Sequence, residues 1–238
     1  MQIVRLDSVE STNRYCEALD LLQVEDFTCF WALEQTAGIG QRGNHWESEP
    51  GKNLTFSLVL HPTILPADRQ FKLTQALALA LVDFLRVFKD LKVKWPNDIY
   101  ISGQKICGTL VSTRLTGNCI VSAVCGIGFN VNQREFPSWV LNPTSLSLLT
   151  GKQYELEPLL WQLLQCIETR YNDLKAGLDL EPEYLKHLLN LDVPARYRYN
   201  EVEIEATIIG VDPHGRLLLT ASDGRRLSCG MKEIALLS

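Results

Sequence analysis

The sequence predicts an α/β fold of the α+β type that ends in a small all-β barrel. Residues 73–88 and 156–174 repeat apolar side chains at the 3.6-residue period of a helix packed on a core. Short apolar runs typical of strands lie around them, and from Val193 onward apolar and polar residues alternate instead. A chain of 238 residues is long enough for one large domain and a small module. We expect these two parts at residues 1–191 and 192–238.

Local patterns predict the elements of the first half. Ser11 is a good N-cap residue, and the apolar spacing after it predicts a helix that reaches Leu22. Pro96 ends a half-buried strand, because proline cannot donate a ladder hydrogen bond. A glycine-rich loop is expected at residues 36–51. The strands are expected at residues 27–33, 54–60, 91–95, 99–101, 105–115 and 119–124.

The second half contains the long helix at 156–174 and a shorter helix expected at 184–191. After that helix, turn residues separate short alternating segments, which is the pattern of a small barrel. Three of its strands are expected at residues 201–209, 216–220 and 225–229.

Composition excludes several classes of protein. Hydrophobic residues make up 46% of the chain and charged residues 21%, which is typical of a globular protein. The net charge of −5 gives no general attraction to nucleic acid or anionic lipid, so an anion site has to be local. Seven cysteines without a C-x-x-C pair and four scattered histidines disfavour a disulfide framework or a zinc site. Since we find no signal peptide and no apolar run of membrane length, we expect a protein of the reducing cytoplasm.

Gly38 to Gly43 match the G-x-G-x-x-G pattern and follow a predicted strand. The dinucleotide-binding form of this pattern opens a helix, whereas here the chain runs on from Asn44 to Gly51 with residues that do not start one. A kinase loop is excluded because the H-R-D and D-F-G motifs are missing. Two interpretations stay open: a loop whose amides wrap an anion, with Trp46 covering a ring, and an ordinary surface loop.

Residues Lys94 to Asp98 place polar groups where a strand ends at proline. Asp98 is positioned to hold Mg²⁺ against a phosphate, and Asn97 to orient that phosphate. Lys105 returns across a predicted hairpin and offers its ammonium group to the charge that develops in phosphoryl or acyl transfer. The alternative is a solvated turn with a surface lysine.

Two more polar segments are candidates for the same cleft. Asn130 and Asn132 follow a glycine pair at the end of a strand run, and a plain loop is the alternative. The hydroxyl groups at residues 11–13 are able to bind a ligand together with the helix amides, and a simple N-cap is the alternative.

Taken in order, these segments resemble the biotin protein ligase family. The matching sequences are S-T-N at 11–13, E-Q-T-A-G-I-G-Q-R-G-N-H-W at 34–46, K-W-P-N-D at 94–98, K-I-C-G-T-L at 105–110 and G-I-G-F-N-V-N at 126–132. Of these, K-W-P-N-D followed by a K-x-x-G hairpin is the most specific.

The resemblance implies both a fold and a reaction. The fold is a mixed β-sheet flanked by helices, similar to class II aminoacyl-tRNA synthetases, with an SH3-like barrel at the C-terminus. The implied activity is that of an ATP-dependent biotin ligase. The biotin carboxylate attacks the α-phosphate of ATP to give biotinyl-5′-AMP and pyrophosphate, and a lysine of a biotin carboxyl carrier protein then takes the biotin. ATP, biotin and Mg²⁺ are the implied small molecules, without a structural metal.

The resemblance also implies residue roles. The implied catalytic residues are Lys105, Asp98 and Arg42, with Asp98 as the Mg²⁺ ligand. The implied biotin-binding residues are Ser11, Thr12, Asn13, Gln35, Gly38, Ile39, Gly40, Gln41, Lys105 and Gly108. The implied ATP- or adenylate-binding residues are Arg42, Gly43, Asn44, Trp46, Lys94, Asn97, Lys105 and Asn130.

Three positions depart from the family's usual loop, G-R-G-R-x-G-R, because Ile39, Gln41 and Asn44 replace arginines. We expect looser retention of the adenylate, since each charge-assisted hydrogen bond contributes about 1.5–3 kcal/mol. The sequence begins close to Ser11, so we expect no N-terminal DNA-binding domain, no nucleic-acid partner and no membrane partner. A homodimer is compatible with the resemblance. The alternatives are a lipoate or octanoate ligase of the same superfamily and a non-catalytic biotin-binding regulator.

Overall fold

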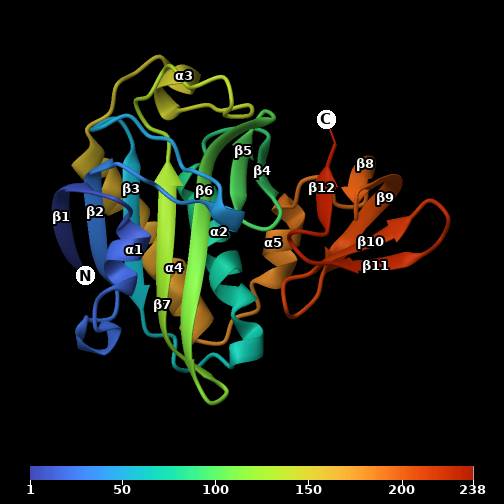
Figure 1. Ribbon diagram of the computed structural model, residues 1–238, viewed down its shortest axis with the longest axis horizontal. Helices are drawn as coiled ribbons and strands as arrows, with labels where there is room; N and C mark the ends of the chain where they lie inside the picture. The colour runs from blue at the N-terminus through green and yellow to red at the C-terminus, as the bar shows by residue number, and fades with distance from the viewer. Residues whose placement is uncertain (238) are drawn as a thin grey trace.

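A seven-stranded mixed sheet forms the larger part of the protein (Figure 1). The computed structural model describes residues 1–237, apart from the side chain of Arg42. In this described part only β1 and β2 pair in parallel, and the other pairs of the sheet are antiparallel, which confirms the expected fold class. The strands, in spatial order, are β1 (Gln2–Val9), β2 (Thr28–Gln35), β3 (Leu54–Leu60), β7 (Cys119–Phe129), β6 (Gln104–Thr116), β5 (Asp98–Ile101) and β4 (Leu91–Lys94).

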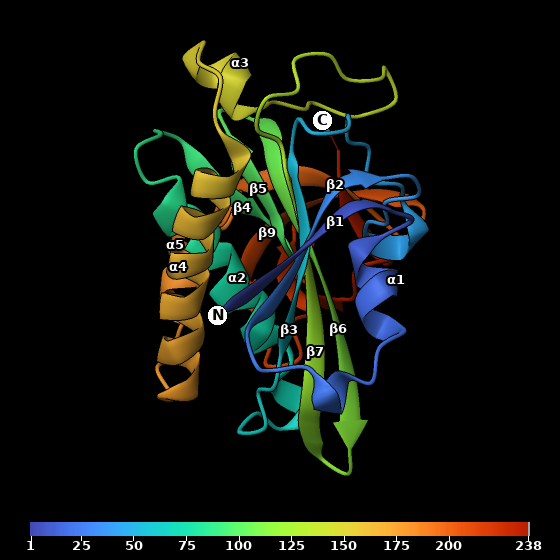
Figure 2. The ribbon, with the colours of Figure 1, turned by 90° about the vertical axis from the view of Figure 1, so that its left-hand side faces the viewer.

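Helices cover both faces of this sheet (Figure 2). α1 (Thr12–Glu17) packs on one face against β2, β3 and β7. On the other face α2 (Phe71–Phe84) is buried between the sheet and α4 (Leu156–Lys175), which explains why apolar side chains surround most of α2. The shorter helices are α3 (Leu146–Thr150), α5 (Glu181–His187) and the 3₁₀ turns η1 (Leu21–Gln23), η2 (Gln41–Gly43) and η3 (Ala67–Arg69).

Three helix boundaries differ from the prediction. α1 ends before Leu22, whose side chain is 69% exposed, because a turn and η1 follow the helix. α2 ends before Phe88, since the chain winds on through a non-helical turn in which the Phe88 N–H donates to the Leu85 carbonyl. α5 begins earlier than the expected 184–191, because Pro182 suits the first turn of a helix. The apolar period continues through such turns, so it overestimates helix length.

β7 is longer than the sequence indicates. The expected strand ends at Val124, but pairing with β3 continues through Gly126, opposite Ser57, and Gly128, opposite Thr55. Residues two apart in a strand lie on the same face. The two glycines therefore leave a flat strip on one face of the sheet.

The C-terminal strands form a five-stranded antiparallel sheet beside β4 and α5 (Figure 1). The expected SH3-like barrel is not closed within the described residues, because the short strands β11 and β12 pair with β10 and β8 and not with each other. No helix in the described part of the chain is long and apolar enough to span a membrane. In spatial order the strands are β11 (Arg226–Cys229), β10 (Leu217–Ala221), β9 (Val202–Val211), β8 (Pro194–Tyr199) and β12 (Ile234–Leu236).

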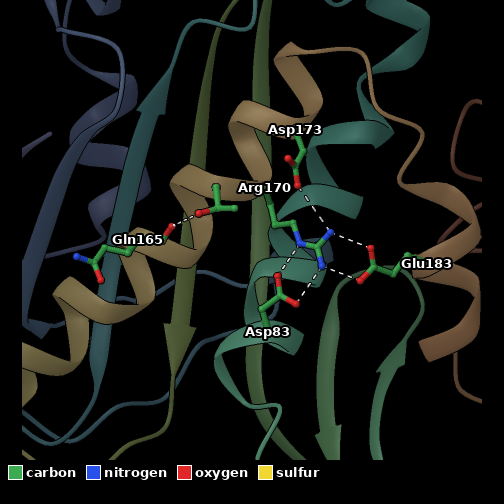
Figure 3. A network of polar contacts seen from close by, with 6 residues as sticks. Asp83, Gln165, Arg170, Asp173 and Glu183 are labelled. Atoms are coloured by element: carbon green, nitrogen blue, oxygen red, sulfur yellow. Dashed lines mark hydrogen bonds and ion pairs between the residues drawn. The ribbon is translucent and has the colours of Figure 1, made fainter.

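An ion-pair network joins three helices behind the sheet (Figure 3). Arg170 of α4 bonds both carboxylate oxygens of Asp83 at 2.6 and 2.9 Å, and both of Glu183 in α5 at 2.6 and 2.8 Å. Asp173 lies 3.8 Å from the same guanidinium. The Arg170 side chain is only 13% exposed, and its hydrogen bonds lower the pKa of Glu183. The network therefore ties α5 to the two long helices.

Arg170→Met should lower the free energy of unfolding by about 1–2 kcal/mol. We expect no larger loss, because the carboxylates are partly exposed and water screens their ion pairs with Arg170. Because the folded pKa of Glu183 is depressed, its contribution is present at neutral pH and is lost as pH falls below about 4.5. The difference between the wild-type protein and Arg170→Met should therefore shrink in acid. Urea unfolding across this pH range measures both effects.

Arg225→Met is the matched control, since Arg225 pairs with Asp223 at 2.7 Å on the surface, where both side chains are more than half exposed. This variant should unfold like the wild-type protein at every pH. An equal loss of stability in the two variants would contradict a special role for the Arg170 network.

Candidate active site

A cleft of about 860 Å³ lies between the start of α1, the glycine-rich loop, the β4–β5 hairpin and the C-terminal sheet. It gathers most of the residues singled out from the sequence, although they come from segments far apart in the chain. Of the predicted site residues, the walls contain Ser11, Thr12, Asn13, Gln35, Ile39, Gly40, Gln41, Gly43, Asn44, Trp46, Lys94, Asn97, Asp98, Lys105 and Gly108.

The glycine-rich loop closes on itself through backbone hydrogen bonds. The Gly40 N–H donates to the Asn44 carbonyl at 2.7 Å, and the Trp46 N–H donates to the Gly38 carbonyl at 2.9 Å. Gly43, at the end of η2, has a φ of 81°, which a residue with a side chain rarely adopts. The loop joins two antiparallel strands, β2 and β3, and contains the short 3₁₀ turn η2 but no α-helix, so the dinucleotide-binding interpretation is excluded.

A neutral polar network occupies one end of the cleft. The amide oxygen of Gln35 accepts from the Thr12 N–H at 2.8 Å and from the Thr12 hydroxyl at 3.1 Å. The Ser57 hydroxyl lies 2.7 Å from both Thr12 Oγ1 and Asn13 Oδ1. Ser11 holds the N-cap position of α1, as expected under either interpretation, and its hydroxyl makes no capping hydrogen bond. These groups, all buried except the half-buried Gln35, offer donors and acceptors without net charge.

The glycines of β7 make room for the groups above them. A Cβ atom at Gly126 would overlap the Asn13 amide, and one at Gly128 would overlap the Trp46 ring. A Cβ atom at Gly108 would lie 3.0 Å from Asp98 Oδ1 and 3.3 Å from the Trp46 ring. Glycine at these positions therefore lets Asn13 and Trp46 lie directly on the sheet.

Charge is concentrated at the other end of the cleft. Lys105 Nζ lies 2.7 Å from Asp98 Oδ2, and 5.6 Å from the centre of the Trp46 ring. Lys94 lies opposite Asp98 in the backbone register of the hairpin, and its Nζ atom lies 5.4 Å from the centre of the Tyr100 ring. Burial lowers the pKa of Lys94 and raises that of Tyr100 to about 12. Two ammonium groups beside one carboxylate form a local cationic site, in a protein whose net charge is negative.

Four predicted residues do not contribute a described side chain to the walls. Asn132 is buried outside the lining, where its amide donates to the Tyr154 carbonyl at 2.8 Å. Gly38 lies behind the lining, against Gln35 and Trp46. Asn130 is buried away from the cleft, where its amide donates to the Thr144 carbonyl at 2.9 Å. The side chain of Arg42 lies outside the described part. Asn97 lines the cleft, but its amide donates to the Thr109 carbonyl, so a structural bond already occupies that group.

A magnesium site built from protein groups alone is absent from the described residues, which contain no cluster of three potential metal ligands. Asp98 is the carboxylate among the lining residues, and its Oδ1 takes no part in the ion pair with Lys105. Mg²⁺ in nucleotide sites is often held by one or two carboxylates together with substrate phosphates and water. The arrangement therefore fits an ion that arrives with a phosphate.

Several residues and segments that form or support the walls carry none of the motifs singled out from the sequence. Ser57 is one that supports the walls from behind, because it is fully buried and its hydroxyl bonds to Thr12 and Asn13. The polar residues at 55 and 57, which interrupt an apolar strand, offered a signal for it. The segment at 139–141 is another, and its Trp139 ring lies 6.3 Å from the ring of His45 in the glycine-rich loop. The far wall comes from the C-terminal sheet, and no local pattern indicates that it faces the cleft. Its lining residues include Tyr197, Ile208, Leu217, Ile234, Ala235 and Leu236.

Comparison with known proteins gives a consistent result. A family model described as "Biotin/lipoate A/B protein ligase family" matches residues 6–130. The bifunctional ligase/repressor BirA of Bacillus subtilis is 30% identical over 92% of this chain and 69% of its own length. The biotin–[acetyl-CoA-carboxylase] ligase of Paracoccus denitrificans is 28% identical, over 93% and 95%.

A solved structure of the biotin protein ligase from Aquifex aeolicus, in complex with biotin and ATP, has a similar fold. It superposes with a TM-score of 0.80 at 26% sequence identity, and the match covers 99% of this chain and 98% of the Aquifex aeolicus chain. This likeness extends through the C-terminal sheet, beyond the residues that the family model covers. The chain therefore belongs to the biotin/lipoate A/B protein ligase family.

Proposed function

We propose that the protein is a biotin protein ligase. It activates biotin with ATP to biotinyl-5′-AMP and then transfers biotin to a lysine of a biotin carboxyl carrier protein. The observation that carries the proposal is one cleft with a neutral polar end and a cationic end, joined over the glycine strip of β7. The family also includes lipoate ligases, but relatives of nearly full coverage bear the names of biotin ligases, which favours biotin over lipoate or octanoate.

The neutral end suits the ring system of biotin. A ureido group has two N–H donors and a carbonyl acceptor but no charge, and hydroxyl and amide side chains satisfy all three. The buried Thr12 and Asn13 and the half-buried Gln35 supply such groups. In this proposal Ser11, Gly40 and Gly108 border the ring system, and Gly38 supports Gln35 from behind.

The cationic end suits the phosphates and the reacting carboxylate. The carboxylate of biotin attacks the α-phosphorus, and the bond from that phosphorus to pyrophosphate breaks. Lys105 offsets the negative charge that grows on the phosphate oxygens, and its ion pair with Asp98 holds the ammonium group in place beforehand. Asp98, together with the phosphates, would hold Mg²⁺, which would supply further charge neutralisation. The exposed flank of Trp46 offers a surface for adenine.

The second step needs no covalent enzyme intermediate. The amine of the acceptor lysine attacks the mixed anhydride, the bond to AMP breaks, and in this proposal Asp98, which lines the cleft, takes the proton of the amine. The glycine-rich loop shields the adenylate from water in the meantime. Ile39, Gln41 and Asn44, which replace the usual arginines, line the cleft with neutral groups, which supports a weaker hold on the adenylate.

We also propose a domain boundary between residues 191 and 192, where the chain leaves α5 and enters the C-terminal sheet. The seven cysteines are free thiols in the structure, which supports a reducing compartment such as the cytoplasm.

The purified protein should release pyrophosphate from ATP and Mg²⁺ when biotin is added. Lipoate and octanoate, tested at the same concentrations, should give only the background rate, because the neutral polar end is matched to a ureido ring. A coupled pyrophosphate assay measures all three. Release with lipoate or octanoate but not with biotin would overturn the choice of substrate.

Lys105→Met should lower kcat for pyrophosphate release by about 10²–10³, since it removes a charge placed against the developing phosphate charge. Lys89→Met, which changes an exposed lysine outside the cleft, is the control and should keep the wild-type rate. Equal rates for the two variants would remove Lys105 from the mechanism.

Gly126→Ala and Gly128→Ala should separate the two ends of the cleft. The first displaces Asn13 and should raise the KM for biotin more than that for ATP. The second displaces Trp46 and should raise the KM for ATP more than that for biotin. Each variant is the control for the other. If the two variants changed the KM for biotin and the KM for ATP in the same way, the assignment of the two ends would be wrong.

A further inference from the structure

The turn between β4 and β5 is held by three different parts of the protein. Lys94 and Asp98 face each other as the last pair of the hairpin, so Trp95, Pro96 and Asn97 form the turn. The Trp95 indole N–H donates to the Gly215 carbonyl at 3.0 Å, and the Asn97 amide donates to the Thr109 carbonyl. Both neighbours of Pro96 are therefore anchored through their side chains.

Pro96 is anchored through its carbonyl group. The Tyr184 hydroxyl donates to that carbonyl at 2.9 Å. Tyr184 is fully buried in α5, where its ring stands edge-on to Phe71 with 5.7 Å between the centroids. Burial raises the pKa of this tyrosine well above its ordinary value, so the hydroxyl stays protonated and remains a donor.

α5 is held in turn by the Arg170 network. Glu183, the residue before Tyr184, is one of the two carboxylates that Arg170 bonds through both oxygens (Figure 3). The chain of contacts therefore runs from the long helix α4 through α5 to the carbonyl of Pro96, two residues before Asp98.

We propose that Tyr184 is a positioning residue: through the Pro96 carbonyl, its hydroxyl holds the β4–β5 turn so that Asp98 stays against Lys105 during adenylate formation. This inference rests on the proposed function for its kinetic consequence. Packing alone does not require the hydroxyl, since a phenylalanine ring would fill the same space against Phe71. What the hydroxyl adds is one directional bond to a buried carbonyl, and a displacement of about 1 Å at a reacting group is enough to slow catalysis severely.

Tyr184→Phe tests the proposal, and Tyr171→Phe is its matched control. Tyr171 is also a buried tyrosine with a neighbouring aromatic ring, and its hydroxyl donates to Asp26 at 3.2 Å, outside the cleft. Tyr184→Phe should lower kcat for biotin-dependent pyrophosphate release about tenfold, with the KM for biotin within about twofold of wild type. Tyr171→Phe should change neither constant. Both variants are assayed below their unfolding transitions.

Amide hydrogen exchange supplies a readout that does not depend on activity. In Tyr184→Phe the amides of Asn97 and Asp98 should exchange faster than in the wild-type protein, and in Tyr171→Phe they should not. If Tyr184→Phe exchanged these amides at the wild-type rate and kept the wild-type kcat, the positioning role would be overturned. If instead the wild-type protein releases no pyrophosphate with biotin, the proposed function fails, while the exchange data still decide whether Tyr184 holds the turn.

Glu183→Gln is the second variant, in case Tyr184→Phe does not fold. It weakens the anchor of α5 at the surface and leaves the core intact, because this side chain is 40% exposed. It should change kcat and the exchange of Asp98 in the same direction as Tyr184→Phe but by less. The absence of any change in both measurements would show that α5 does not hold the turn.

Discussion

The absence of two side chains on one face of β7 allows the cleft to form. Gly126 and Gly128 let the Asn13 amide and the Trp46 ring reach the backbone of the central sheet. Because side chains alternate along a strand, this flat strip coexists with an opposite face that packs against the core. Ile127, between the two glycines, is 3% exposed, as expected for a strand that is covered on both faces.

The cleft separates two kinds of chemistry along this strip. At one end Thr12, Gln35 and Ser57 satisfy one another without charge, which suits a ligand that is itself neutral and rich in hydrogen-bonding groups. At the other end Lys105 and Asp98 hold charge in a partly buried setting, where electrostatic interactions are stronger than in bulk water. The two ends therefore favour one orientation of a substrate that carries both a neutral ring and an anionic end.

The same helices serve stability and site geometry. Arg170 joins α4 to α2 and α5, and α5 contacts the β4–β5 turn through Tyr184. The C-terminal sheet contacts that turn through the Gly215 carbonyl. The turn immediately precedes Asp98, so contacts from α5, which lies outside the walls, and from the C-terminal sheet, which forms one of them, reach the segment that carries a proposed catalytic carboxylate.

Local patterns were sufficient for the fold class, the two long helices, the glycine-rich loop and the cluster at Lys94–Asp98. Period and turn chemistry act over a few residues, so one segment reveals them. Other features depend on contacts between distant segments: the continuation of β7 through its glycines, the burial of Asn130 away from the cleft, and the open C-terminal sheet. In β7 the cost of glycine in a strand is offset by the groups that pack on it, and those groups come from elsewhere in the chain. The part played by Ser57 likewise becomes visible only when α1 lies against β3.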